Sequence, residues 1–363
     1  MPKKSKTPAR TGFSGQRRAA LLGIFAVVGL IYSVSSFYRI THPPRTQFKR
    51  PHVLFSIESG TQSMSMMNQY VWISPIKVLV LRQQIAATQS AYVFDTDSGL
   101  QSAAPTGLAR AMKGAWMVDL TRSVSPDGKW MLAQIVGKNG VIRIETISTS
   151  DAEPGRTIAP TSASTIANES FAAPEWLADS VHWLAIAETQ GAKGRLIESG
   201  LGQTVRTGPS AEWFGDIIGC DRPGNPIVLA DAGTGPNLET YNAKTGKLIS
   251  SAPLKVSANK SLVTDAIISP MRDRVAYINS VPGQCYFSDS VTRLIPYLRR
   301  FRSAPLYSIW VAHLDGMHAV EIAEFEQNKQ IEFSNMIVQL QWRPDESTVS
   351  FMRDGKLWEV SLY

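Results

Sequence analysis

A long uncharged stretch lies near the start of the chain. From Ala19 to Tyr38 no charged residue occurs, and a helix of about 20 residues at about 1.5 Å each spans a hydrocarbon core of about 30 Å. A cleaved signal peptide is the alternative, but its apolar region is about 7–15 residues long and ends at a small-residue cleavage site. We therefore expect a transmembrane helix over residues 19–38. Its apolar anchor residues are Leu21, Leu22, Ile24, Phe25, Val27, Val28, Leu30 and Ile31.

The residues that flank this stretch predict its orientation. Residues 1–18 form a basic tail with six lysines and arginines and no acidic residue, and basic residues favour the cytoplasmic side of a membrane. Residues 39–51 contain three prolines and no periodic pattern, which is typical of an extended linker. We expect a single-pass protein of the bacterial inner membrane, with its N-terminus in the cytoplasm and everything after the linker in the periplasm.

The rest of the chain repeats one pattern: a short strand, a turn, a second apolar strand and a third strand. In its clearest copy Pro126, Asp127 and Gly128 favour a tight turn, because proline fixes φ and glycine accepts a positive φ. The turns of the six copies lie at Pro75, Pro126, Ala178, Pro223, Pro270 and Pro344. Most of the spacings are near the about 40–50 residues of a four-stranded propeller blade. The sequence thus predicts an all-β, six-bladed β-propeller over residues 52–363, preceded by one transmembrane α-helix.

Two irregularities of the repeat predict how the ring is built. Later hairpin turns lie at Gly99, Gly246 and Gly316, and the last of these comes about 22 residues late relative to its own proline turn. We therefore expect an insertion at about 281–306 in blade five. The last copy ends without a fourth strand, whereas residues 52–58 form a lone apolar strand before blade one. This strand is expected to supply the missing outer strand and so leave no open edge.

The motifs that carry the repeat resemble a known family. The phrases SPDGKW at 125–130, RPDE at 343–346 and DGKLWEV at 354–360 are similar to the WD-repeat-like β-propeller units of the TolB type, which occur in bacterial periplasmic proteins. The resemblance covers most of residues 52–363. It implies a binding platform rather than a catalyst, although fold by itself does not transfer function.

The distribution of charge excludes one class of partner. The formal net charge is +7, but ten of the 37 basic residues lie in residues 1–50, where no acidic residue occurs. The remaining chain carries 27 basic against 30 acidic residues. A basic domain that neutralises phosphates is therefore ruled out, and we expect no nucleic-acid partner.

No motif predicts catalysis, a metal or a cofactor. His313 and His318 flank the turn at Asp315 and Gly316 and lack the helical spacing of a metal-ligand pair, so a metal site there is not expected. Asp127, Asp345 and Asp354 recur with the repeat and are explained as turn caps. Three clustered methionines, Met64, Met66 and Met67, are more often adaptable apolar packing than soft-metal ligands. Most of the nine tryptophans fall at strand positions, where packing between blades is expected. We therefore expect no enzyme.

The blade-five insertion is the strongest candidate for a partner site. It mixes arginines with aromatic residues, which are enriched at interface hot spots, although a solvated loop with a short helix is an equal alternative. The candidate partner-binding residues are Arg293, Tyr297, Arg299, Arg300, Phe301 and Arg302.

Cys220 and Cys285 are the two cysteines. Cys220 follows a first strand and Cys285 a second strand, so they lie on opposite faces of the ring. Bridged Cα atoms lie within about 7 Å, and we therefore expect both thiols to be free.

Together these features predict a non-catalytic, membrane-anchored subunit that docks on and scaffolds a larger membrane protein complex. It would contact the lipid bilayer through residues 19–38. The alternative is a free-standing periplasmic module that recognises a peptide, a glycan or an envelope-assembly partner.

Overall fold

The structure is a computed structural model, and it divides the chain into two units, Met1–Phe48 and Lys49–Tyr363. All described residues belong to the second unit; they are 51–56, 69–82, 89–113, 115–120, 124–137, 142–150, 169–189, 194–201, 206–211, 217–231, 235–256, 262–281, 293–295, 306–326, 338–353 and 355–362. The basic tail and the helix expected over residues 19–38 lie outside this set. Within it, no helix has both the length and the apolar character needed to cross a membrane.

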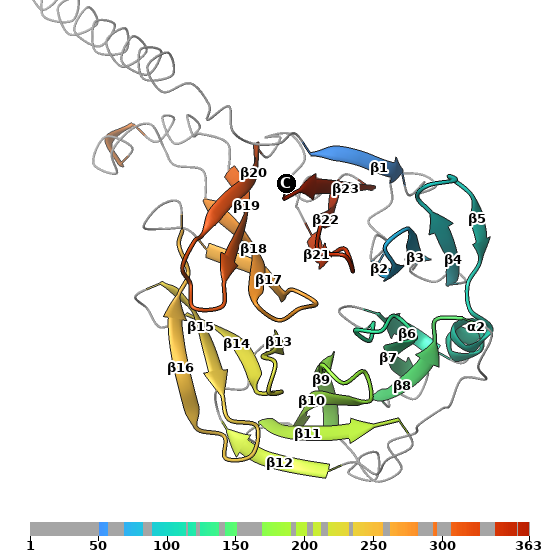
Figure 1. Cartoon of the computed structure of the whole chain (residues 1–363), viewed down its shortest axis with the longest axis horizontal. Coiled ribbons are helices and arrows are strands. Elements are labelled where there is room, and N and C mark those ends of the chain that lie inside the picture. The colour runs from blue at the N-terminus through green and yellow to red at the C-terminus, as the bar shows by residue number, and fades with distance from the viewer. Residues whose placement is uncertain are drawn as a thin grey trace, which may run out of the picture. The chain divides into compact units, whose positions relative to one another are not determined.

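The described residues form six antiparallel sheets arranged in a ring, as predicted (Figure 1). From the inner strand outward, blade one consists of β2 (Gln69–Ser74), β3 (Lys77–Arg82), β4 (Ser90–Asp95) and β5 (Gln101–Ala103). The described strands of blade two are β6 (Ala115–Asp119), β7 (Trp130–Gly137) and β8 (Ile142–Ser148). Blade three consists of β9 (Glu169–Trp176), β10 (His182–Thr189), β11 (Gly194–Gly200) and β12 (Arg206–Ala211). Helix α2 (Thr106–Lys113) lies between blades one and two in the chain.

The second half of the chain completes the ring. Blade four consists of β13 (Ile217–Cys220), β14 (Pro226–Asp231), β15 (Pro236–Tyr241) and β16 (Leu248–Pro253). Blade five consists of β17 (Leu262–Ile268), β18 (Arg274–Val281), β19 (Leu306–His313) and β20 (Val320–Glu326). Blade six consists of β21 (Val338–Trp342), β22 (Thr348–Arg353), β23 (Lys356–Ser361) and β1 (His52–Ser56).

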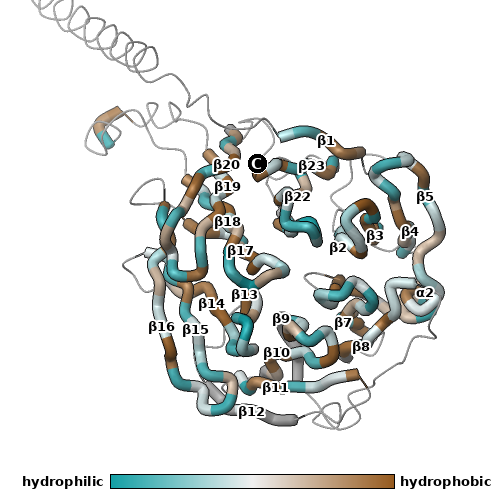
Figure 2. The backbone as a smooth tube through the Cα atoms, in the orientation of Figure 1, coloured by the Kyte–Doolittle hydropathy of each residue, from teal (hydrophilic) through white to brown (hydrophobic). Residues whose placement is uncertain are grey.

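The middle strands of the blades are the most apolar because each blade packs between two neighbours. In β3 four consecutive residues are buried, and in β18 five. A strand covered on both faces reads as a continuous apolar run rather than as an alternating one. Figure 2 shows apolar segments along the strands and hydrophilic segments at turns near the centre of the ring.

The proline turns confirm the predicted repeat. Each of the six predicted turn positions lies between the first and second strands of its blade. Gly99, Gly246 and Gly316 lie in the third-to-fourth strand hairpins, with φ values of 70°, 69° and 77°. These are left-handed conformations that glycine adopts without steric cost. The insertion also lies where it was expected, since β18 ends at Val281 and β19 begins at Leu306.

Ring closure by the N-terminal strand is confirmed. Strand β1 pairs with β23 in antiparallel register, His52 opposite Glu359 and Ser56 opposite Lys356. Successive side chains of a regular strand, such as Leu54 and Phe55, point to opposite faces, but a bulge between Val53 and Phe55 interrupts this alternation. Both side chains consequently pack on the apolar cluster between blades six and one. The bulge inserts one extra residue and turns the strand locally.

The strand directions define two faces of the ring. We call the face with the six turns between first and second strands the turn face. Strand β23 ends on the turn face, so its antiparallel partner β1 begins there. The insertion joins the end of β18 to the start of β19 and therefore leaves the ring on the opposite face.

Candidate functional site

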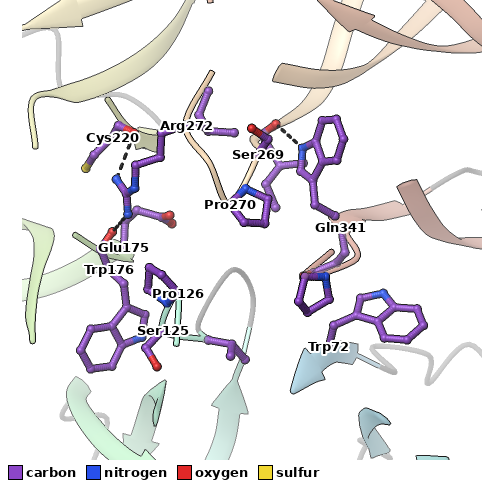
Figure 3. Close-up of a pocket in the computed structure, with 15 residues that line it drawn as sticks. Trp72, Ser125, Pro126, Glu175, Trp176, Cys220, Ser269, Pro270, Arg272 and Gln341 are labelled. Carbon is purple, nitrogen blue, oxygen red and sulfur yellow. Dashed lines mark hydrogen bonds between the residues drawn. The ribbon is translucent and has the colours of Figure 1, made fainter. Parts of the chain in front are cut away.

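A cavity lies where the inner strands of all six blades approach the turn face. It encloses about 110 Å³, and every blade contributes to its wall (Figure 3). One wall residue from each blade, in order, is Trp72, Pro126, Trp176, Cys220, Arg272 and Gln341. We call this place, where the inner strands of the six blades meet at the turn face, the channel mouth.

Five of the six turns around this mouth, all but that of blade one, contain a residue with a positive φ. The residue two positions after the turn start has a positive φ at Gly128 (72°), Ser180 (57°), Arg272 (60°) and Glu346 (56°). In blade four the equivalent conformation is adopted by Gly224, with φ at 90°. Glycine adopts this region freely, but for other residues it is strained by about 1–3 kcal/mol. In blades three, five and six, the non-glycine residue at this position therefore has a strained backbone.

The strained conformation of Arg272 places its side chain in contact with two other blades. The residue is only 7% exposed. Its Nη1 donates to the carbonyl oxygen of Cys220 in blade four at 3.0 Å, and its Nη2 donates to the carbonyl oxygen of Trp176 in blade three. Figure 3 shows both bonds at one side of the opening. The guanidinium group thus joins three consecutive blades.

Glu346 makes the corresponding link from blade six to blade five. It is 5% exposed, and its Oε1 accepts a hydrogen bond from the backbone N–H of Met271. Its Oε2 pairs with Nη2 of Arg274 at 2.5 Å. The Arg274 guanidinium carbon in turn lies 5.3 Å from the ring centre of Trp342, a cation–π distance. The same turn position in blade three acts similarly, since Ser180 Oγ accepts from the backbone N–H of Asp127 at 3.0 Å.

Aromatic side chains join the first and last blades, as predicted for the tryptophans. Nε1 of Trp72 donates to Ser350 Oγ at 2.8 Å, and the hydroxyl of Tyr70 donates to the carbonyl oxygen of Gln339 at 2.7 Å. Burial raises the pKa of Tyr70 well above its ordinary value, so its hydroxyl stays a donor. Nε1 of Trp342 reaches the carbonyl oxygen of Ile267 in blade five at 3.1 Å.

Cys220 is a free thiol in the wall of the cavity. Burial, followed by the negative charge of Glu175, raises the pKa of Cys220 to about 12, and the positive charge of Arg272 opposes the rise only in part. A thiol with this pKa is protonated at neutral pH and is a poor nucleophile. Cys285 lies outside the described residues, so the expected absence of a bridge between the two remains a prediction.

The other candidates for chemistry have structural roles where they are described. Asp345 accepts hydrogen bonds from the N–H and hydroxyl of Ser347, and Asp127 from the N–H of Lys129 and from Ser125, which confirms both as turn caps. His313 and His318 stack edge to face with ring centres 5.4 Å apart. In the part of the chain that the structure covers, no cluster of histidine, cysteine and acidic residues has metal-site geometry. Asp354 and the clustered methionines lie outside that part.

The predicted partner and anchor residues are mostly beyond the described ranges. Arg293 is described and exposed. Its neighbour Leu294 is 83% exposed and Ile295 is also exposed. The other five partner candidates, Tyr297, Arg299, Arg300, Phe301 and Arg302, lie outside the described residues, as do all eight anchor residues from Leu21 to Ile31.

Sequence reasoning missed the polar residues of the channel mouth. Glu175, Arg272 and Gln341 line the cavity, and none was singled out. A signal was present at Arg272 and Glu346, because both stand where the clearest copy of the repeat has Gly128. A large charged residue at a glycine position of a turn indicates a role for its side chain.

Similarity to known proteins is found among solved structures. No protein-family model and no curated protein sequence matches the chain. The structure of TolB from Acinetobacter baumannii is similar at 12% identity and a TM-score of 0.46, over 80% of this chain and 62% of that one. A structure from a study of two prolyl endopeptidases is similar at 14% identity and a TM-score of 0.43, over 83% of this chain and 41% of that one. A component of the mitotic checkpoint complex is similar at 13% identity and a TM-score of 0.46, over 88% of this chain and 95% of that one.

These matches correct one expectation. The absence of an enzymatic role was inferred from the lack of catalytic motifs and from the TolB-type resemblance, and that inference is wrong, because a structure from a study of two prolyl endopeptidases is among the matches. The chain spans about three fifths of the TolB chain that it matches, and likenesses at 12–14% identity identify no family. The described part of the chain is a six-bladed β-propeller that its own N-terminal strand closes.

Proposed function

We propose that the protein is a membrane-anchored subunit whose propeller, outside the cytoplasm, docks on and scaffolds a larger membrane protein complex. The observation that carries the proposal is the relation between β1 and the blade-five insertion. Strand β1 directly follows the linker and begins on the turn face, whereas the insertion leaves the ring on the opposite face. A tether on one face and a docking element on the other suit a module that bridges a membrane and a partner.

The chemistry of the insertion supports its use as a docking element. Arg293 is exposed beside Leu294 and Ile295, two apolar side chains that are also exposed. Exposed apolar residues next to arginine are typical of protein interfaces. The proposed contact residues are Arg293, Tyr297, Arg299, Arg300, Phe301 and Arg302.

The proposed location follows from the N-terminal sequence. Residues 19–38 would contact the lipid bilayer of a bacterial inner membrane, with residues 1–18 in the cytoplasm. The ring would then lie in the periplasm. Strand β1 would transmit any pull on the linker directly to blade six, since it pairs with β23.

A second candidate function is a free-standing periplasmic recognition module. The cavity of about 110 Å³ at the channel mouth favours it, because all six blades contribute to its wall. The two candidates differ in what accompanies the protein. A scaffold remains bound to membrane proteins in stoichiometric amounts, whereas a recognition module is mostly solitary.

Purification of the full chain in mild detergent tests the proposal. We expect membrane proteins to co-purify, and to be lost when Arg299, Arg300 and Arg302 are all replaced by alanine. The matched control replaces Arg110 and Lys113, exposed basic residues of α2, by alanine and should retain the partners. Recovery of a solitary chain, or equal loss of partners in both variants, would overturn the scaffold.

A further inference from the structure

The channel mouth holds a buried positive charge. Arg272 is 7% exposed, and its guanidinium group bonds to two backbone carbonyls. Among the described residues no carboxylate oxygen lies within ion-pair distance of it. Burying a guanidinium without a counter-charge is unfavourable. The equivalent turn positions in blades two and four are Gly128 and Gly224, which adopt the same positive φ without strain.

A negative charge lines the same cavity. Glu175 is partly exposed at the end of β9, next to Trp176, and contributes to the cavity wall. The charges of Glu175 and Arg272 both act on the buried thiol of Cys220, in opposite directions. Figure 3 shows the three residues on one side of the opening. A carboxylate has about four acceptor positions, so Glu175 can accept from a ligand while keeping other contacts.

An unpaired polar group lies across the mouth from these charges. Gln341 is 7% exposed and lines the cavity, and its Nε2 has no hydrogen-bond partner among the described residues. Figure 3 shows Gln341 on the side opposite Arg272. A buried donor without a partner destabilises a fold, and each such case calls for an unseen water, ion or ligand.

The size of the cavity limits which ligand could bind to these polar groups. Its volume of about 110 Å³ is far above the about 10–15 Å³ that one water needs. It is well below the about 300–1,000 Å³ of pockets for drug-sized ligands. An occupant would therefore be larger than one water and smaller than a drug-sized ligand, and the wall offers it one positive charge, one negative charge and one amide donor.

We propose that the channel mouth binds a free α-amino acid with a polar side chain, its carboxylate at Arg272, its ammonium at Glu175 and its side-chain oxygen at Gln341. Opposite charges on neighbouring ligand atoms match opposite charges on one side of the wall, and charge-assisted hydrogen bonds are the strongest available there. The ligand also provides the counter-charge that the described residues do not offer Arg272. This binding site is independent of the docking element on the insertion.

Calorimetric titration of the full chain in mild detergent tests the site with L-glutamine as the probe. We expect saturable binding. Glutarate, which lacks the ammonium, and butylamine, which lacks the carboxylate, should each bind at least about tenfold more weakly, as expected when one charged contact is lost. Binding of either analogue as tight as that of L-glutamine would overturn the proposal. So would no heat of binding for L-glutamine, or tighter binding of a peptide blocked at both ends.

Two variants assign the contacts. Glu175→Gln should weaken L-glutamine binding about tenfold or more, whereas Glu324→Gln, the same change at an exposed site on β20, should leave it unchanged. Gln341→Leu should make L-glutamine bind no better than L-alanine, and its melting temperature should equal or exceed that of the unaltered chain, because an unpaired buried donor is removed. Unchanged preference for L-glutamine in Gln341→Leu, or equal binding by both glutamate variants, would contradict the assignment.

Discussion

Arg272 combines a strained backbone, a buried charge and contacts to two neighbouring blades. The strained backbone and the buried charge do not stabilise blade five itself. The hydrogen bonds of Arg272 instead link blades three, four and five. Glu346 does the same between blades six and five. Polar contacts at one turn position thus fix how neighbouring blades sit around the mouth.

Truncation of Arg272 is expected to destabilise the ring. Arg272→Ala removes two charge-assisted hydrogen bonds to carbonyl oxygens of blades three and four and keeps the strained φ, so the free energy of unfolding should fall by roughly 2–4 kcal/mol. Arg272→Gly should lose less, because glycine relieves the strain. Urea unfolding followed by tryptophan fluorescence measures both. If Arg110→Ala, at an exposed site on α2, costs as much, the inter-blade role is refuted.

The thiol of Cys220 should resist alkylation in the folded protein. Its pKa is raised to about 12 by burial and by Glu175, and only the thiolate reacts. An ordinary cysteine with a pKa of about 8.5 reacts faster as pH rises from 7 to 9, whereas the Cys220 peptide should stay unlabelled over that range. Mass spectrometry after iodoacetamide treatment, with and without denaturant, provides the measurement. Labelling of the native protein that rises steeply below pH 9 would show that the thiol is not buried in this way.

At the scale of elements, strand β1 has the largest effect for its length. Its five residues close the ring by pairing with β23. Phe55 stacks on Phe94 of blade one with ring centres 4.0 Å apart, and Glu359 Oε1 lies 2.7 Å from Nε2 of His52. The strand thus contacts both blades that meet at the closure.

Loss of the Phe55 ring should weaken this closure. Phe55→Ala removes the stacking and part of the apolar cluster between blades six and one, so we expect a loss of roughly 1–3 kcal/mol, less than for a fully buried phenylalanine. Val53→Ala provides the control, since Val53 is exposed and outside that cluster. Thermal unfolding of the two variants gives the comparison. Equal melting temperatures would mean that β1 contributes pairing alone.

At the scale of the whole molecule, the pairing of β1 with β23 brings the two ends of the propeller together. The C-terminal strand β23 therefore lies beside the strand that follows the linker. A label at either end reports on the same region of blade six. This makes the C-terminus a suitable place to test on which side of the membrane the ring lies.

The expected topology can be tested at the C-terminus. A reporter enzyme that is active only in the periplasm, fused after Tyr363, should be active if residues 19–38 span the membrane with the N-terminus inside. A reporter that is active only in the cytoplasm should remain silent at the same position. The reverse pattern would place the propeller in the cytoplasm.

Local sequence determined the blades, because their signals are local. Proline and glycine restrict φ at single positions, so the turns at Pro126 and Pro270, the hairpin at Gly246 and the bounds of the insertion could all be predicted. The closure by β1 could also be predicted from the sequence, because the last copy of the repeat lacks an outer strand and one extra strand precedes blade one. Helix α2 was not predicted, because its eight residues are too few for the helical spacing of Leu108 and Ala111, which are buried in the core, to stand out in the sequence.

Only the tertiary structure decided what surrounds the channel mouth. The bulge that turns Leu54 and Phe55 to one face depends on how β1 meets β23, which no local pattern encodes. Glu175, Arg272 and Gln341 are far apart in the chain and share a cavity because six inner strands end on one face. From the sequence alone, a polar turn residue is expected to be exposed to solvent. Its burial depends on the neighbouring blade, which only the tertiary structure places. The repeat therefore fixed the ring, and contacts between blades fixed the chemistry at its centre.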